Sequence, residues 1–150
     1  MIYPAGWFLI SLLTLSNVAD PEVGHIQWQF SSLQQSSTEW ELAFTAKIDR
    51  GWHLYSQSIE EGGPMPTSFE FDEGDGFELL GNVTEAGEAK QVFDSIFVMN
   101  VVWYETEVVF TQRVKAKSDV SVSGKVSYSV CSEERCIPGS TRFAISLKKK

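Results

Sequence analysis

The chain has 150 residues, of which 43% are apolar and 21% charged, a composition typical of one globular domain rather than a disordered segment. Acidic residues outnumber basic ones by 20 to 12, and the net charge is −8. Because nucleic-acid surfaces need clustered cations, this balance argues against DNA or RNA as a partner. The terminal lysine run is too short to reverse that; it is typical of a solvated chain end, with a membrane-surface role as the alternative.

The N-terminal segment has an apolar stretch at residues 7–15, followed by small residues at 17–19 that fit a cleavage site. The stretch is too short to cross a bilayer comfortably, and no longer apolar stretch follows. We therefore expect a signal peptide at residues 1–19 and an exported domain at residues 20–150, in a compartment where disulfides persist. The first basic residue is Lys47, so a misassigned start, a retained anchor and a buried first strand stay open as alternatives.

Beyond residue 24 the dominant hydrophobic period is two, which is typical of strands with one buried face. The legible strands, in chain order, are residues 25–30, 39–48, 66–71, 76–83, 107–114, 124–130 and 141–147. Turn signals separate them at residues 49–51, 60–64, 72–76 and 117–119. No segment sustains a helical period. The pattern predicts an all-β fold, an immunoglobulin-like antiparallel β-sandwich.

Two segments break this alternation. Residues 51–57, "GWHLYSQ", crowd aromatic and polar groups together, and residues 91–104, "QVFDSIFVMNVVWY", are almost continuously apolar. The second segment is either a buried strand or a strand interrupted by a loop at residues 95–100. In the loop alternative, Phe97 and Met99 are exposed and cover a site or a partner surface.

The chain has only two cysteines, Cys131 and Cys136, separated by four polar residues. A zinc site needs four ligands, or three and a water, and the remaining soft ligands are His25 and His53, neither at zinc-finger spacing. We therefore expect no metal. As a staple for the fold the pair is weak, because closing so short a loop contributes on the order of 2 kcal/mol.

Strand parity places Cys131 on the face opposite Val126, Tyr128 and Val130. If those larger side chains face the core, Cys131 emerges on the polar face at the end of the strand, where a reactive thiol is accessible. On these grounds alone, a redox-active pair and a structural bridge remain equally open.

Several segments, in this order, resemble the N-terminal periplasmic domain of the bacterial thiol:disulfide interchange protein DsbD. The segments that carry the resemblance are "GWHLYSQ", "GGPMPTSFEF", "FDSIFVMNVVWYE", "FTQRVKA" and "VSYSVCSEERCIPGSTRF". The resemblance spans residues 24–147, and the cysteine hairpin and the segment before it are its specific parts.

The resemblance implies an immunoglobulin-like thiol:disulfide oxidoreductase domain whose only cofactor is a redox-active Cys131–Cys136 disulfide. Cys136 corresponds to the cysteine that forms the mixed disulfide, and Cys131 to the one that resolves it. The implied cap loop contains Ile96, Phe97, Val98 and Met99, with Phe97 shielding the pair, and the implied site-lining residues are Tyr128 and Tyr55. Ser95 and Ile96 stand where the family has acids flanking the cap.

The implied partners are thioredoxin-like domains, both as electron donor and as oxidised substrates. The resemblance also implies a periplasmic monomer with no membrane span after the signal peptide. No membrane transporter or thioredoxin-like motif follows in this sequence, so we expect electrons to arrive from a separate protein or from the rest of a longer one. The rival hypothesis is a secreted binding module with an inert disulfide and an adhesive cap.

Overall fold

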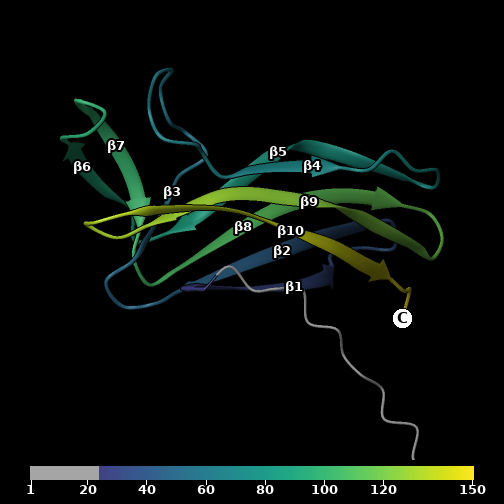
Figure 1. Ribbon diagram of the computed structural model, residues 1–150. Helices are drawn as coiled ribbons and strands as arrows, with labels where there is room; N and C mark the ends of the chain where they lie inside the picture. The colour runs from purple at the N-terminus through teal and green to yellow at the C-terminus, as the bar shows by residue number, and fades with distance from the viewer. Residues whose placement is uncertain (1–23) are drawn as a thin grey trace, which may run out of the picture.

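The computed structural model describes residues 24–150, so the expected signal peptide at residues 1–19 lies outside the described residues. Two antiparallel sheets pack face to face (Figure 1). The four-stranded sheet has the order β1 (Ile26–Gln34), β2 (Glu39–Ile48), β8 (Glu107–Ala116), β5 (Phe77–Gly87). The six-stranded sheet has the order β10 (Cys136–Leu147), β9 (Val120–Cys131), β3 (His53–Tyr55), β7 (Met99–Tyr104), β6 (Lys90–Asp94), with β4 (Ser68–Phe71) also paired to β9. The predicted immunoglobulin-like β-sandwich is confirmed.

The expected strands are present, and the alternating pattern fixes which of their residues face inward. In β2, all five apolar residues of the expected set are buried: Trp40, Leu42, Phe44, Ala46 and Ile48. Strands β9 and β10 are longer than expected, because their ladder runs from Val120↔Leu147 to the Cys131–Cys136 pair. Strand β5 also continues past its expected end, through a register shift between Leu80 and Thr84. A bulge of this kind lets a long edge strand bend.

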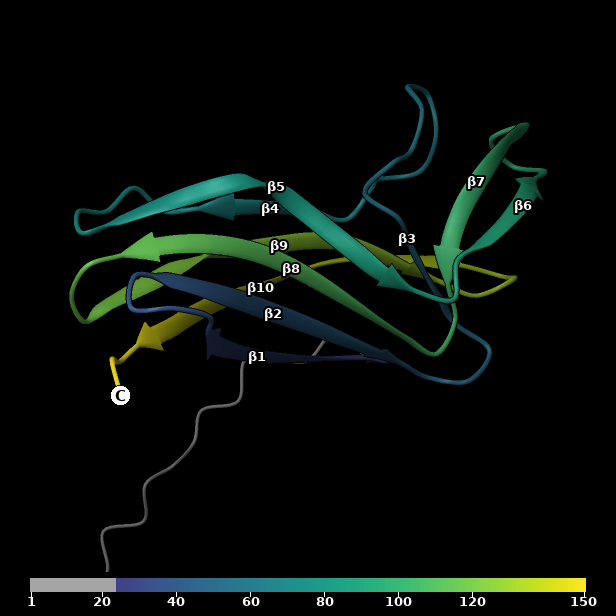
Figure 2. The same cartoon turned by 180° about the vertical axis from the view of Figure 1, so that it is seen from behind.

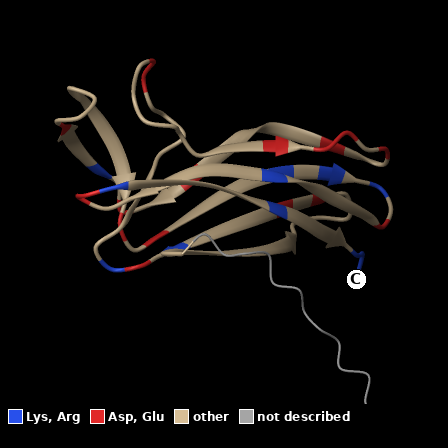
Figure 3. Cartoon of the chain, in the orientation of Figure 1, with Lys and Arg blue, Asp and Glu red and all other residues tan. Residues whose placement is uncertain are grey.

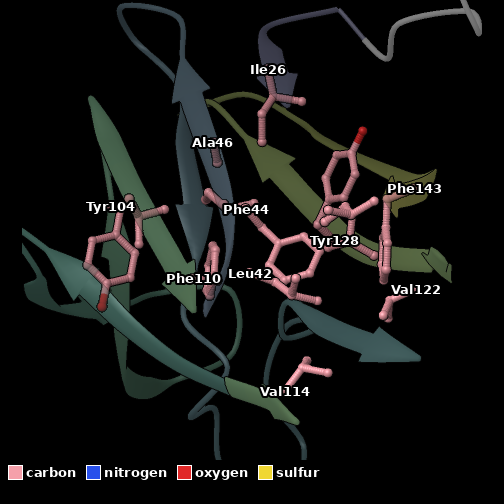
Figure 4. Packing of buried hydrophobic residues seen from close by; sticks show 14 of the residues in the cluster. Ile26, Leu42, Phe44, Ala46, Tyr104, Phe110, Val114, Val122, Tyr128 and Phe143 are labelled. Atoms are coloured by element: carbon pink, nitrogen blue, oxygen red, sulfur yellow. The ribbon is translucent and has the colours of Figure 1, made fainter. Parts of the chain in front are cut away.

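The core lies between the two sheets and is dominated by aromatic contacts. Phe44 of β2 packs on Phe143 of β10, with ring centroids 4.8 Å apart, and on Phe69 of β4 at 4.9 Å. Figure 4 shows Phe44, Phe110, Tyr128 and Phe143 converging from both sheets. Such pairs add to the stabilisation from area burial and hold the two layers in register.

The segment at residues 91–104 forms a hairpin, so the strand is interrupted as the second interpretation predicted. The expected loop at residues 95–100 is two residues too long, and the expected exposure of Phe97 and Met99 is wrong, because both are half-buried. Strands β6 and β7 pair from Lys90↔Trp103 to Asp94↔Met99, and the turn between them covers residues 95–98. We call β6, this turn and β7 the cap hairpin, and residues 95–98 the cap turn. Seen from both sides, the cap hairpin projects from the same end of the sandwich as the β9–β10 turn (Figures 1 and 2). Within residues 24–150, no helix has the length and hydropathy needed to cross a bilayer.

Candidate functional site

Cys131 and Cys136 face each other across the β9–β10 hairpin and are joined by a disulfide. Their Cα atoms lie 4.1 Å apart. The hairpin turn is closed by a hydrogen bond from the Ser132 N–H to the Arg135 carbonyl at 2.8 Å. The Ser132 hydroxyl accepts from the N–H groups of Glu134 at 3.2 Å and Arg135 at 3.3 Å, a local pattern that favours turns. The four intervening residues therefore hold the two sulfurs in bonding position.

The two cysteines differ sharply in exposure. Cys131 is only 1% exposed and belongs to a small apolar cluster with Tyr55 and Val101. Ile59, Met99 and Trp103 pack against this cluster. Cys136 is exposed. The face predicted for Cys131 is correct, since it lies opposite the buried Val130, but the predicted access is wrong, because side chains from β7 and the loop after β3 cover it.

A cleft of about 960 Å³ opens beside Cys136. Its lining comes from three segments: residues 48–55 around β3, the cap hairpin and the segment after it, and the turn at residues 132–136. Cys131 is not part of the lining. A thiolate entering from this cleft therefore meets Cys136 first, and Cys131 lies behind it.

Asp94, the last residue of β6, organises the cap turn. Its Oδ1 accepts hydrogen bonds from the N–H groups of Ile96 at 2.8 Å and Phe97 at 3.2 Å. Its Oδ2 accepts a hydrogen bond from the Tyr55 hydroxyl at 3.1 Å. Burial of Tyr55, together with the Asp94 carboxylate, raises the pKa of this phenol well above its ordinary value. One carboxylate thus joins the cap turn to β3.

The structure distributes the predicted cap residues between the cleft and the surface. Phe97 is half-buried, and it lines the cleft together with Ile96. Ile96 is 77% exposed and Val98 is 72% exposed, so the crest of the cap turn is apolar and faces solvent. Met99 is the first residue of β7 and packs against the cluster that contains Cys131.

The two predicted site tyrosines have different places. Tyr55 is buried beside Cys131 and also lines the cleft. The structure does not bring Tyr128 to the disulfide: this residue is 1% exposed in the main core, where it packs on Trp28 with ring centroids 5.4 Å apart. The reason is parity, because Tyr128 lies three residues before Cys131 and so points to the opposite face of β9.

The sequence pattern argued against a metal-ligand role for His53 and did not place this residue at the site. The imidazole stacks on the Trp103 ring at 3.8 Å, and its Nε2 lies 3.4 Å from the Tyr55 hydroxyl oxygen. Burial lowers the pKa of His53, against the opposing effects of Glu105 and Asp94. The signal was present in the sequence, since His53 lies two residues before Tyr55 and therefore on the same face of a strand.

Charged side chains surround the cleft, and Figure 3 shows Asp and Glu at the loop tips of this end of the molecule, with Lys and Arg beside them. Glu105 forms an ion pair with Lys90 at 2.5 Å. Hydrogen bonds from Lys90, which has the larger effect, and from the Trp103 ring nitrogen lower the pKa of Glu105. The Arg135 guanidinium lies over the Trp52 ring, 5.6 Å from its centroid. Within residues 24–150, no group of three or more His, Cys, Asp and Glu side chains is arranged to hold a metal ion.

Comparison with known proteins points to one family. The family model described as "Thiol:disulfide interchange protein DsbD, N-terminal" matches residues 20–148. No curated protein sequence matches the chain.

Similar folds occur in several solved structures. The N-terminal periplasmic domain of ScsB from Proteus mirabilis is 19% identical, with a TM-score of 0.62. The match covers 87% of this chain and 49% of the ScsB domain, so this chain spans about half the length of the ScsB domain. The reduced DsbD N-terminal domain of Neisseria meningitidis is 19% identical with a TM-score of 0.54, and the match covers 80% of this chain and 86% of that one. A complex between the DsbD N-terminal and PilB N-terminal domains of the same organism gives 13% identity and a TM-score of 0.53, covering 85% of this chain and 87% of that one. At these identities the likeness concerns the fold.

Proposed function

Because the chain belongs to the family of DsbD N-terminal domains, we propose that it is a thiol–disulfide relay domain whose Cys131–Cys136 pair cycles between disulfide and dithiol. The observation that carries this proposal is the asymmetry of the pair. Cys136 is exposed on a cleft, whereas Cys131 is buried behind it. A structural disulfide does not need one sulfur presented to solvent; exchange through a mixed disulfide does.

In the proposed reaction the reduced domain passes two electrons to a partner disulfide. The Cys136 thiolate attacks one partner sulfur, a Cys136–partner disulfide forms, and the other partner sulfur leaves as a thiolate that takes up a proton. Cys131 then attacks Cys136, the Cys131–Cys136 bond forms, and the second partner sulfur leaves. The partner ends as a dithiol and the domain as a disulfide. The same steps in reverse reload the domain from a donor.

The cap turn is proposed to shield the pair. Phe97 and Cys136 line the same cleft, and Asp94 holds the turn in place through two backbone hydrogen bonds. Such a cover limits wasteful oxidation of the reduced thiols. If it does, Phe97→Ala speeds the reaction of reduced Cys136 with a bulky thiol reagent. The control is Val98→Ala, which removes a side chain 72% exposed on the same turn and outside the cleft lining, and it leaves the rate unchanged. Equal rates for Phe97→Ala and the parent protein would remove the shielding role.

The proposed partners are thioredoxin-like domains in the periplasm, one as donor and others as oxidised substrates. The complex of a DsbD N-terminal domain with a PilB N-terminal domain supports a folded protein domain as the partner. The net charge of −8 supports a partner other than nucleic acid. Export by a signal peptide at residues 1–19 and a monomeric state belong to the same proposal.

The decisive experiment is the redox equilibrium of the pair against glutathione, read by thiol trapping on residues 20–150. A relay requires a reduction potential of about −270 mV or above, whereas structural disulfides typically lie below about −300 mV. A value in the lower range would overturn the relay and favour a binding module with an inert bridge. With a value in the upper range, Cys131→Ser is expected to accumulate a mixed disulfide through Cys136, and Cys136→Ser is expected to accumulate none.

A further inference from the structure

The buried position of Cys131 poses a chemical requirement that the cysteine pair alone does not meet. In the resolving step Cys131 must attack as a thiolate. Its surroundings are largely apolar: Tyr55 and Val101 share its cluster, and Met99 packs against it. The Ser129 hydroxyl lies 3.6 Å from its sulfur, but a neutral hydroxyl is not a base that could take up the thiol proton. Burial in such surroundings raises the pKa of a thiol and disfavours the thiolate. The resolving step therefore needs a base close to Cys131.

His53 lies beside Cys131 on the neighbouring strand. The β3–β9 register pairs His53 with Cys131 and Leu54 with Val130. Leu54 and Val130 are fully buried in the main core, so His53 and Cys131 share the opposite, outer face of the sheet. Residues paired in this way have Cβ atoms about 4.5–5.5 Å apart. Because Cys136 pairs with Cys131 on its other side, the imidazole and both cysteines form one row across β3, β9 and β10.

The hydrogen-bond chain fixes which imidazole nitrogen is free. The Tyr55 hydroxyl has one proton, and it donates that proton to Asp94. At the contact with His53 the Tyr55 oxygen must therefore accept, so Nε2 carries the proton and Nδ1 keeps its lone pair. Burial moves the pKa of His53 below its ordinary value of 6.5, and a neutral imidazole of this kind accepts a proton at neutral pH.

We propose that His53 is the general base that activates Cys131 in the resolving step, an assignment that rests on the relay function proposed above. As the Cys131 thiol attacks the mixed disulfide at Cys136, its proton passes to the free nitrogen of His53. The Cys131–Cys136 bond forms, the bond from Cys136 to the partner breaks, and the partner sulfur leaves with the electron pair. The imidazolium then returns its proton to the departing thiolate or to water. In reverse, the same imidazolium protonates Cys131 when the disulfide is opened.

The charges around His53 are compatible with this role. Asp94 from β6 and Glu105 after β7 both favour the imidazolium, so they stabilise the proton once it has been transferred. Other titratable or charged groups also face this region. Tyr55 and Cys131 lie in the buried cluster, and the cleft lining adds Cys136, Arg50, Glu133, Glu134 and Arg135. The stack on Trp103 holds the ring plane while the charge changes.

The two chemical steps can be timed separately with a chromogenic aromatic disulfide mixed in equimolar amount with the reduced protein. Attack by Cys136 releases the first coloured thiolate in a second-order phase, and attack by Cys131 releases the second in a first-order phase. His53→Phe keeps a ring for Trp103 to stack on but has no base. We expect its second phase to slow by about a hundredfold or more at neutral pH, within the usual range of about 10²–10⁴-fold for general-base catalysis, with less than about a twofold change in the first.

The pH dependence separates a base from a packing residue. In the parent protein the second phase is expected to stay flat from the pKa of His53 up to the region where Cys131 itself ionises. In His53→Phe it is expected to rise about tenfold per pH unit, because the thiolate must form unaided. Added imidazole should partly restore the second phase of His53→Ala, since the open cleft admits a small molecule.

The matched control is His25→Phe. His25 is the only other histidine, it also stacks on a tryptophan, Trp52, at 3.9 Å, and it lies outside the cleft lining. The His25→Phe variant is expected to keep both phases.

If His53→Phe unfolds at a markedly lower temperature than the parent protein, His53→Gln replaces it. Equal second phases in the parent and His53 variants, or no imidazole rescue, would overturn the role of His53. A parent protein that releases only one thiolate would instead contradict the relay itself, and the base assignment with it.

Discussion

The Tyr55 hydroxyl donates to Asp94 Oδ2 at 3.1 Å, across 39 residues of sequence, and so ties the strand beside Cys131 to the turn that lines the cleft. The other oxygen of Asp94 accepts two backbone N–H groups of the cap turn. Loss of this one carboxylate therefore removes both the hydrogen bond to Tyr55 and the two hydrogen bonds within the turn. The cap and the strand beneath it are mechanically coupled through Asp94.

Asp94→Ala is expected to speed reduction of the disulfide by dithiothreitol by a few fold, because the cap turn loses the hydrogen bonds that hold Phe97 at the cleft. Loss of these bonds is expected to cost about 1–2 kcal/mol of folding free energy. Asp75→Ala, which removes an exposed acid in the loop between β4 and β5, is the control and should match the parent rate. A slower or unchanged rate in Asp94→Ala would show that Asp94 does not restrain the cap.

Stability is expected to fall above pH about 10 because of Tyr55 and Tyr104. Burial raises the pKa of both phenols above their ordinary value of 10.0, with Asp94 adding to the effect at Tyr55 and Glu85 at Tyr104. The folded protein therefore holds these protons more tightly than the unfolded chain does. Their contribution is complete below the unfolded pKa and is lost as the pH rises through the folded one.

Urea unfolding at a series of pH values from about 8 to about 11 measures this contribution. The free energy of unfolding of the parent protein should decline over the upper part of the range. Tyr55→Phe should show a shallower decline, and Tyr55→Phe combined with Tyr104→Phe a shallower one still. Parallel curves for the three proteins would contradict the assignment.

Glu85→Ala is expected to destabilise the fold by about 2 kcal/mol, the range for hydrogen bonds to a charged group. Glu85 lies on β5 in the four-stranded sheet, and its Oε1 accepts from the Ser56 hydroxyl at 2.9 Å and the Gln57 N–H at 3.0 Å, just after β3 of the other sheet. Denaturant unfolding is the measurement, with Glu78→Ala, an exposed acid on the same strand, as control. A loss no larger than that of the control would show that this bridge between sheets carries no stability.

Gly124→Ala is expected to destabilise the fold by about 2–3 kcal/mol without changing the reduction potential. A Cβ at this position of β9 would meet the backbone carbonyl of Glu70 and would lie 2.6 Å from the Phe143 ring. Ser121→Ala, at an exposed position of the same strand, is the control. Thermal unfolding and the glutathione equilibrium together check the prediction. A shifted potential would show that strain here reaches the cysteines at the other end of β9.

The fold could be predicted because one face of most strands is buried. Strand β2 is the clearest example, since its strict alternation gives both its bounds and its core face. The cap hairpin was harder, because residues 91–104 carry apolar groups on both faces. One face of β7 packs on the main core through Tyr104, and the other covers Cys131 through Met99, Val101 and Trp103. Periodicity cannot locate a turn in a segment that is buried on both sides.

The site could be predicted only in part. Parity gave the correct face for Cys131, but its cover comes from Ile59 and Met99, which lie more than thirty residues away in sequence. The position of His53 beside Tyr55 follows from strand parity, but its pairing with Cys131 depends on the β3–β9 register, which no local pattern encodes. The family resemblance supplied Phe97 and Tyr55 as residues of the cleft, and it also supplied Tyr128, which the fold directs into the core instead.

The shortness of the covalent loop has a consequence for how this protein matures. The cysteines close a loop of only four residues at the tip of a hairpin whose ladder runs for twelve paired positions, to Leu147↔Val120. Closing so small a loop changes the entropy of the unfolded chain little, so folding does not wait for oxidation. A chain with free thiols is therefore expected to reach the same native fold as the chain with the disulfide.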